Sequence, residues 1–292
     1  MNLLFPADIK KLLNRYETHP SKALGQNFLI DKNILNKIIQ ASNLKPDDTV
    51  LEIGPGIGTL TQELAKHVGK IIAIEKDKTM VEILKETLSG YKNIKIINAD
   101  ILKLNLSNVD ATAQLLPRYK VVANIPYYIT APLIRFLLEA ENRPDFMVLM
   151  VQKEVAQRIC ASPPNMSLLA VSVQFYCLPP HSNPSEGASP KIVSYVSKNC
   201  FWPVPKVDSA IIKITPHKIV GHRESHNLFF KVVKAGFSHP RKQLGGNLSA
   251  GLKLTKEKTA DWLKKNNLNP KQRAETLSVS DWQNLAKTVD NF

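Results

Sequence analysis

The chain has 292 residues, of which 43% are hydrophobic, and it carries a formal net charge of +14 at pH 7. This length suggests one large or two ordinary domains, and the apolar content is enough for a sizeable core. The sequence contains no run of about 18 apolar residues and no signal-peptide pattern in its first residues (MNLLFPADIKKLL), so no transmembrane helix or secretion is expected.

Strands and helices are predicted to alternate through the first half of the chain. After a helical apolar spacing at 33–43, strand patterns occur at 49–53, 70–75, 94–98, 120–123 and 146–151, and helical patterns occur at 60–68, 80–88, 132–139 and 154–160. Continuous β-branched runs separated by helices are typical of a parallel sheet covered on both faces. We therefore expect a doubly wound α/β domain.

The second half of the chain changes character. Residues 179–190 (PPHSNPSEGASP) read as an exposed loop, and strand patterns follow at 191–196 and 207–214. Helical patterns then occur at 228–236, 255–266 and 280–288. We place a domain boundary near 216, which divides the chain into residues 1–215 and a helical domain of residues 216–292.

Positive charge is concentrated in the C-terminal third. Residues 191–292 contain 18 Lys and Arg against 7 Asp and Glu, whereas residues 1–190 contain 21 against 18. Such an asymmetry favours a polyanionic partner, nucleic acid first, and the alternative is a merely soluble basic surface.

The cysteines indicate no special chemistry. Cys160, Cys177 and Cys200 are widely spaced and match neither a metal-binding nor a disulfide pattern. We expect buried thiols in a reducing cytoplasm and no bound metal.

A glycine-rich segment, LEIGPGIGTLT (51–61), lies between a predicted strand and a predicted helix. Glycines such as Gly54 let the backbone approach a ligand at a helix N-terminus. Glu75 ends the next strand, where a carboxylate can accept hydrogen bonds from both ribose hydroxyls. The pair predicts a nucleoside-bearing cofactor, either NAD or S-adenosylmethionine.

Two details favour S-adenosylmethionine. Glu52 and Pro55 stand in the loop, where a pyrophosphate would prefer an uncluttered cradle of N–H groups. Asp100 follows the third strand, where it can accept from an adenine amino group. The alternative for Asp100 is a helix N-cap or turn.

The fourth strand ends in NIPYY (124–128). The side-chain oxygen of Asn124 and the carbonyl of Ile125 can accept the two hydrogens of an exocyclic amino group. Pro126 biases Ile125 towards an extended backbone. Tyr127 can stack on the base, and Tyr128 is expected to be a packing residue. The attack on a methyl group carried by a sulfonium needs no general base at first. The rate of methyl transfer therefore comes mainly from positioning the target nitrogen in line with that methyl.

Together these stretches resemble the KsgA-type small-subunit ribosomal RNA adenine dimethyltransferases, from about residue 22 to 285. LGQNFLID (24–31), VQKEVAQR (151–158), FWPVPKVDSA (201–210) and RAETLS (273–278) complete the resemblance, and the last two are the most specific for this branch. The loop at 179–190 and the linker at 161–167 depart from the usual pattern.

The resemblance implies a Rossmann-like methyltransferase sheet of seven strands, the last antiparallel, with a small all-helical C-terminal domain that binds RNA. It implies a monomeric enzyme that uses S-adenosylmethionine to dimethylate two adjacent adenosines in a 3′-terminal stem-loop of small-subunit ribosomal RNA, within a pre-ribosomal particle. The flipped adenine would enter the site.

The resemblance also assigns residues. Cofactor contacts fall on Asn27, Leu29, Gly54, Glu75, Asp100 and Asn124. Catalytic positions are Asn124, with Tyr127 and Phe201 sandwiching the adenine. RNA contacts fall on Lys231, Lys234, Arg241 and Lys242. The alternatives are a core role for Phe201 and a solvated basic face for the four cations.

Three other functions are weighed against this one. A large-subunit methyltransferase of the antibiotic-resistance type shares the first motifs but not FWPVPKVDSA and RAETLS. A non-catalytic RNA-binding assembly factor is disfavoured by the intact Glu75, Asp100 and NIPY. A NAD dehydrogenase would transfer hydride and would bind NADH.

Overall fold

A computed structural model describes residues 1–104, 118–177, 190–217 and 223–289. Contacts divide the chain into two compact units. Unit 1 comprises Met1–Ala156 and Lys191–Pro216, and unit 2 comprises Gln157–Pro190 and His217–Phe292. The expected loop at 179–190 lies, except for Pro190, outside the described residues.

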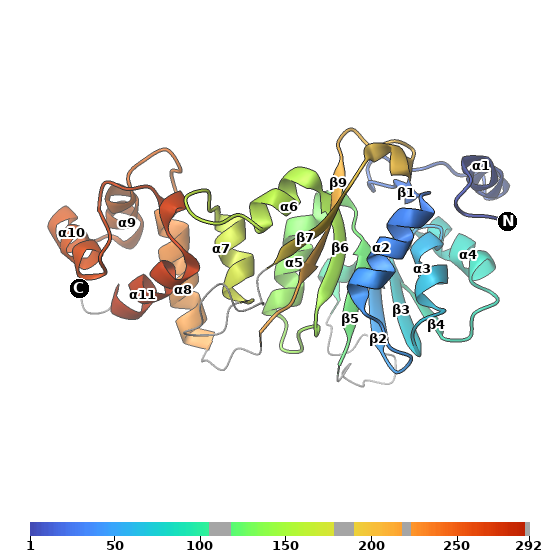
Figure 1. The fold of residues 1–292 in the computed structure, drawn as a ribbon, viewed down its shortest axis with the longest axis horizontal. Coiled ribbons are helices and arrows are strands. Elements are labelled where there is room, and N and C mark those ends of the chain that lie inside the picture. The colour runs from blue at the N-terminus through green and yellow to red at the C-terminus, as the bar shows by residue number, and fades with distance from the viewer. Residues whose placement is uncertain (105–117, 178–189, 218–222, 290–292) are drawn as a thin grey trace. The chain divides into compact units, whose positions relative to one another are not determined.

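Unit 1 is built on a seven-stranded sheet of order β4-β3-β2-β5-β6-β9-β7 (Figure 1). Its strands are β2 (Thr49–Ile53), β3 (Lys70–Glu75), β4 (Ile94–Asn98), β5 (Lys120–Asn124), β6 (Met147–Gln152), β7 (Lys191–Val196) and β9 (Ser209–Ile214). The first five run parallel to one another, and β9 is antiparallel to both β6 and β7. The predicted doubly wound sheet with an antiparallel last strand is confirmed.

Apolar side chains on both faces explain why these segments form buried strands. Val50 and Leu51 of β2 are both fully buried, as are most residues of β3, β5 and β6. Figure 1 shows α2 (Lys32–Ser42) and α3 (Thr59–Leu64) in front of the sheet and α5 (Thr130–Glu139) behind it. A parallel sheet needs this double cover, because both of its faces are apolar.

Side-chain caps set where two helices of unit 1 begin. Asp31 accepts hydrogen bonds from the first main-chain N–H groups of α2, and Asp77 does the same for α4 (Lys78–Thr87). Each cap satisfies donors that have no partner within the helix. The α2 cap fixes the start of this helix, directly after the N-terminal segment that ends at residue 30.

Two features of unit 1 are not predicted from the sequence. Helix α1 (Pro6–Arg15) buries Ile9, Leu12 and Leu13, whose helical spacing after Pro6 was the available signal. The two-residue strands β1 (Phe28–Leu29) and β8 (Phe201–Trp202) pair as a separate antiparallel sheet. Pairing between such distant short segments leaves no periodic signal in a sequence.

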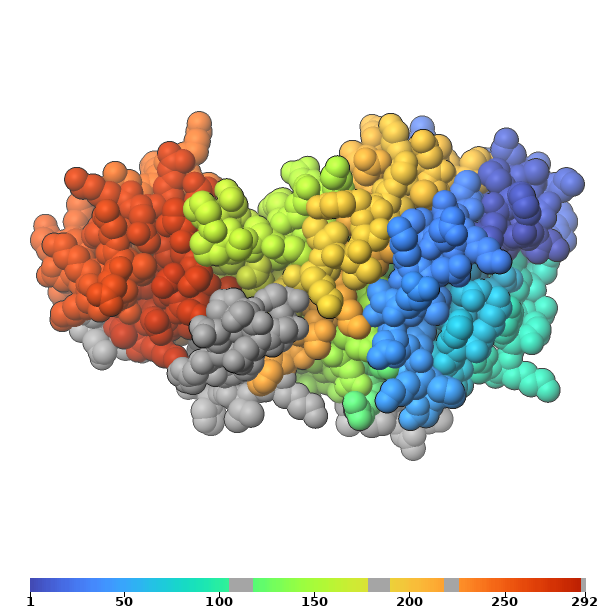
Figure 2. All heavy atoms as spheres, in the orientation of Figure 1, coloured from blue at the N-terminus to red at the C-terminus, as the bar shows by residue number. Residues whose placement is uncertain are grey.

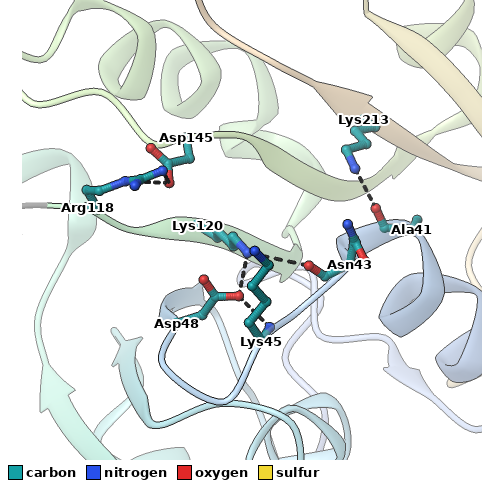
Figure 3. A network of polar contacts seen from close by, with 8 residues as sticks. All are labelled: Ala41, Asn43, Lys45, Asp48, Arg118, Lys120, Asp145 and Lys213. Atoms are coloured by element: carbon teal, nitrogen blue, oxygen red, sulfur yellow. Dashed lines mark hydrogen bonds and ion pairs between the residues drawn. The ribbon is translucent and has the colours of Figure 1, made fainter.

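A network of polar contacts ties α2 to the amino ends of the parallel strands (Figure 3). The Lys120 ammonium pairs with Asp48 and donates to the Asn43 carbonyl, and Lys213 donates to the Ala41 carbonyl at 2.8 Å. Burial lowers the pKa of Lys213. The network lies at the end of the strands opposite their carboxyl ends.

Unit 2 is helical. It contains α7 (Leu168–Phe175), α8 (Arg223–Gly236), α9 (Leu244–Leu252), α10 (Lys256–Lys265) and α11 (Val279–Thr288), and α6 (Lys153–Ile159) spans the division between the units. Trp262 and Trp282 are fully buried at its centre. No helix in the described part of the chain is long and apolar enough to cross a membrane.

Two helices of unit 2, α7 and α9, are not predicted. Three glycines lower the helix propensity of α9, so its sequence does not predict a helix. A Cβ on Gly251 would stand 2.6 Å from the Ala235 Cβ, so this glycine lets α8 and α9 approach closely. Helix α7 belongs with the C-terminal helices because Phe175 stacks on Phe229 with ring centroids 4.0 Å apart.

The two compact units agree only in part with the domain boundary expected at residue 216. The chain does change unit after Pro216, but residues 157–190 group with the C-terminal helices. The compact units therefore differ from a simple division into residues 1–215 and 216–292. The assignment of functions to those two parts stays a prediction.

The cysteines are only partly as expected. Cys177 is buried, whereas Cys160 and Cys200 are partly exposed. The Cys200 thiol lies 3.5 Å from an Asp31 carboxylate oxygen, and burial together with that carboxylate raises its pKa.

Candidate functional site

A pocket opens at the carboxyl ends of the parallel strands of unit 1. It holds about 980 Å³ of empty space, including open solvent at its mouth. Ligands bind at this edge in open α/β sheets. Four strand ends contribute Gly54, Glu75, Asp100 and Asn124, and the segment from Leu24 to Leu29 supplies another wall.

The glycine loop follows β2. Gly54, Gly56 and Gly58 have φ of +68°, +59° and +94°, in the left-handed region that side chains disfavour. A Cβ on Gly54 would stand 3.1 Å from the Pro126 Cδ, inside the pocket wall. The absence of a side chain on Gly54 therefore lets NIPY pack against the loop. The N–H groups of the three glycines donate within the fold, to the Ile74 carbonyl, the Glu75 carboxylate and the Pro55 carbonyl.

Glu75 is a fixed acceptor in the pocket. It is 7% exposed, its Oε2 accepts the Gly56 N–H at 3.1 Å, and its Oε1 accepts the Asp77 N–H at 2.9 Å. Burial is the main cause that raises its pKa, and the main-chain N–H groups oppose that effect. Each oxygen keeps acceptor capacity, so two adjacent hydroxyls could each donate to this carboxylate.

Asp100 has two partners. Its Oδ1 accepts the Leu102 N–H at 3.2 Å and so caps a 3₁₀ helix, Ile101–Lys103, which confirms the capping alternative. Its Oδ2 lies 3.0 Å from the Lys76 ammonium, which holds the Asp100 pKa below its usual range. Asp100 lines the pocket as well, so the cap does not remove it from the predicted binding role.

Asn124 is oriented by the N-terminal segment. Its Nδ2 donates to the Asn27 carbonyl at 3.2 Å. This bond fixes the orientation of the amide, whose only acceptor is Oδ1. Asn27 and Leu29, both predicted from the resemblance, line the same pocket.

The two tyrosines of NIPYY differ in their surroundings. The Tyr127 hydroxyl lies 2.6 Å from the Ser209 Oγ at the start of β9, and burial raises the Tyr127 pKa. Tyr128 is 51% exposed and also lines the pocket. The expectation that Tyr128 is a packing residue is therefore wrong, because half of its side chain is exposed at the pocket.

Phe201 is not brought into this pocket. It is 1% exposed and packs in the hydrophobic core with Leu35 and Val196, next to its strand partner Leu29. This arrangement matches the core alternative. A stacking role for Phe201 stays a prediction that would require its side chain to leave the core.

The four predicted RNA contacts lie together in sequence in unit 2. Lys231 and Lys234 are exposed on α8, three residues apart and so on one helix face. Arg241 and Lys242 are exposed in the turn before α9. All four cations are therefore accessible to a partner, and the binding of RNA by them stays a prediction.

Two residues that shape the pocket, Gln26 and Phe28, were not predicted as site residues. Gln26 donates from Nε2 to Asp77 at 2.8 Å and fastens the N-terminal wall. Phe28 lies against the glycine loop, with its ring edge 3.1 Å from a Cβ built on Gly56. Gln26 and Phe28 are the neighbours of Asn27 within LGQNFLID, so this motif could have predicted both as pocket residues.

Glu52 lies in the pocket wall as a buried acid. It is 1% exposed, and its Oε2 has no hydrogen-bond partner among the described residues. Burial is the main cause that raises its pKa to about 8, and the Glu75 carboxylate adds to the effect. The side chain is therefore mostly protonated at pH 7.

Comparisons with known proteins agree with one another. A family model described as ribosomal RNA adenine dimethylase matches residues 18–291. "Ribosomal RNA small subunit methyltransferase A" of Dehalococcoides mccartyi strain 195 is 43% identical over 96% of this chain and 91% of that protein. The protein of the same name from Alkaliphilus metalliredigens is 40% identical over 98% of each chain.

Two solved structures share the fold over 90% of this chain. A dimethyladenosine transferase from Plasmodium falciparum matches with a TM-score of 0.71 and 28% identity, over 97% of its own chain. The 23S rRNA methyltransferase ErmE matches with a TM-score of 0.69 and 26% identity, over all of its chain.

Proposed function

Because the chain belongs to the ribosomal RNA adenine dimethylase family, we propose that it dimethylates two adjacent adenosines in a 3′-terminal stem-loop of small-subunit ribosomal RNA, using S-adenosylmethionine. One observation carries the proposal most directly. The ends of four strands place a glycine loop, two carboxylates and NIPY around a single pocket.

The pocket suits S-adenosylmethionine, which supplies a methyl group on a sulfonium. Glu75 would accept from the ribose hydroxyls, and Asp100 would accept from the adenine amino group. The bare backbone at Gly54 would face the methionine part, beside the buried Glu52. Pro55 in the loop removes an N–H that a dinucleotide pyrophosphate would use.

Asn124 positions the target nitrogen. Its Oδ1 and the Ile125 carbonyl would accept the two hydrogens of the adenine amino group and hold the nitrogen in line with the methyl. The bond from Asn124 to the Asn27 carbonyl fixes which end of the amide faces the substrate. Positioning of this kind is the main source of rate when the leaving group is already charged.

Tyr127 offers a face for the extruded base. Its hydroxyl is anchored to Ser209, so its ring has little freedom to turn. Stacking on an aromatic ring stabilises a flipped base by about 1–3 kcal/mol. After transfer, the methylated nitrogen gives its extra proton to solvent, because neither Asn124 nor Ile125 can take it.

The small subunit is the better assignment for this chain. Fold likeness does not discriminate, since ErmE and the dimethyladenosine transferase have similar TM-scores. Sequence likeness does, since relatives at 38–43% identity are named small-subunit methyltransferases, and ErmE is 26% identical.

The setting of the reaction is also part of the proposal. The substrate would be a pre-ribosomal particle in the cytoplasm, and the enzyme would act as a monomer. Lys231, Lys234, Arg241 and Lys242 would bind RNA phosphates, which dominate the affinity of proteins for nucleic acids. The exposure of all four side chains supports this role.

A methylation assay on purified ribosomal subunits tests the function. Label from S-adenosylmethionine should enter small-subunit RNA as dimethyladenosine, and label in the large subunit alone would overturn the assignment. A non-catalytic assembly factor would incorporate none. Calorimetry should show binding of S-adenosylmethionine and no binding of NADH.

A further inference from the structure

A second exposed surface of unit 1 lies beside the pocket and has no role so far. It is formed by Lys153, Tyr195, Lys198, Val204, Lys206 and Val207, which we call the rim surface. Figure 2 shows the segment that contains most of it in yellow and gold on the face of unit 1.

Main-chain and side-chain contacts join the rim surface to the pocket wall. Gln152, the last residue of β6, pairs with Ser209, the residue whose hydroxyl holds Tyr127. The adjacent Lys153 N–H donates to the Asp208 carbonyl at 3.0 Å. The rim surface therefore begins where the stacking tyrosine is anchored.

Its aromatic group is unusually accessible. Tyr195 is 52% exposed on the edge strand β7, and the Lys153 ammonium lies 5.3 Å from its ring centroid. Val204 and Val207 are 56% and 44% exposed. An exposed ring beside a cation is the pairing with which proteins bind single-stranded nucleic acids.

The charge of the rim surface is positive. Lys153, Lys198 and Lys206 are exposed, and none of them forms an ion pair with a residue that the structure describes. Two acids are near, Glu154 and Asp208. The Asp208 carboxylate already accepts the Lys198 main-chain N–H at 3.0 Å. The three ammonium groups stay available for an anionic partner.

We propose that the rim surface binds the RNA strand next to the target adenosine, with Tyr195 stacked on a neighbouring base and the three lysines on phosphates. The proposal rests on the proposed function, because it takes the target adenine to lie against Tyr127. It adds a binding surface in the catalytic unit to the cations predicted in unit 2. Flanking nucleotides held there would keep the flipped base in register.

The aromatic part is tested with Tyr195→Ala and Tyr195→Phe in the full-length protein. The affinity for purified small-subunit ribosomal RNA is measured by filter binding, and S-adenosylmethionine binding is measured by calorimetry. Tyr195→Ala should weaken RNA binding about fivefold or more, and Tyr195→Phe should retain it. Cofactor affinity should stay unchanged in both, which also shows that the variants are folded.

The charged part is tested with Lys198→Ala/Lys206→Ala. The matched control is Lys45→Ala/Lys92→Ala, which removes the same charge at exposed positions before β2 and β4, at the end of the strands opposite the pocket. The rim variant should lower the slope of log affinity against log salt by about 1.4, because each phosphate contact in a single strand contributes about 0.7. The control should leave the slope near the wild-type value.

Three results would overturn the proposal. Equal effects of the two double variants would mean that only net charge matters. Unchanged RNA binding by Tyr195→Ala would remove the stacking role. Normal binding to naked RNA with weakened binding to small-subunit particles would assign the rim surface to a ribosomal protein. A wild-type protein that binds this RNA but labels no adenosine would instead refute the proposed function.

Discussion

The side-chain nitrogen of Asn124 donates a hydrogen bond to the main-chain carbonyl of Asn27, at 3.2 Å and across 97 residues of sequence. The bond connects the end of β5 to the segment that walls the pocket. It also determines the orientation of the amide that is proposed to grip the target amino group.

Asn124→Asp should abolish that orientation. A carboxylate cannot donate to the Asn27 carbonyl, and its negative charge would face an oxygen at hydrogen-bond distance. We expect single-turnover methyl transfer to fall about 100-fold or more, since misplacement by an ångström costs that much in a reaction driven by positioning.

Asn27→Ala is the comparison variant, because it keeps the main-chain carbonyl and removes only a side chain that is predicted to contact the cofactor. At saturating S-adenosylmethionine it should leave the single-turnover rate within a few fold of wild type, with any weakening confined to cofactor affinity. Equal loss in both variants would show that the bond is not what orients Asn124.

Glu75→Gln should weaken S-adenosylmethionine binding. One of the two main-chain N–H groups that point at the carboxylate would then face an amide N–H₂ group, and one acceptor for ribose would be lost. A hydrogen bond to a charged group is worth about 1.5–3 kcal/mol, so calorimetry should show a dissociation constant about 10- to 100-fold higher. Glu82→Gln on the exposed face of α4 should leave the constant unchanged, and similar weakening in both would contradict the role of Glu75.

Glu52 should make the protein less stable as pH rises. Its pKa is about 8 in the folded state against an ordinary 4.5, so between these values the folded state holds a proton that the unfolded state has lost. The free energy of unfolding then falls with pH, at up to about 1.4 kcal/mol per unit.

Urea unfolding of Glu52→Gln between pH 5.5 and 8 checks this slope. The variant should show a flatter dependence on pH, with part of the slope kept because the pKa of Glu75 is also raised. Parallel curves for wild type and variant would mean that Glu52 is ionised in the fold.

Lys120→Ala should destabilise unit 1. Its ammonium and the Asp48 carboxylate are mostly buried, with side-chain exposures of 10% and 16%, so the change would leave a buried charge without its partner. Such losses cost about 3–5 kcal/mol. The measurement is the free energy of unfolding in urea.

Arg118→Ala provides the comparison, because its ion pair with Asp145 is solvent-exposed on the arginine side. Exposed pairs are worth about 0–1 kcal/mol. A small effect of Lys120→Ala, no larger than that of Arg118→Ala, would show that water reaches Asp48 in the fold.

The sequence predicts the sheet well because the strands of a buried parallel sheet require continuous apolar, β-branched runs. The bounds expected for β2, β3, β4 and β7 are those of the structure, since β-branched runs begin and end where the chain enters and leaves the sheet. The carboxyl ends of such strands share one edge, so Glu75 and Asp100 could be placed at one pocket before any coordinates.

Long-range pairing is what the sequence does not reveal. Phe201 joins Leu29 through a two-residue strand pair, and this pairing decides that its ring is buried. In α9, glycines that lower helix propensity are required by packing against α8, so the local signal points the wrong way.

The bond between Tyr127 and Ser209, together with the pairing of β1 with β8, has a consequence for synthesis of the chain. The strand ends that bear Gly54, Glu75, Asp100 and Asn124 all emerge before residue 125. The partner of β1 emerges only at 201–202, and the anchor of Tyr127 only at 209. A nascent chain therefore completes the four strand ends that line the pocket long before the partners of β1 and of Tyr127 have been made, and the proposed site is complete only after β9 has been made.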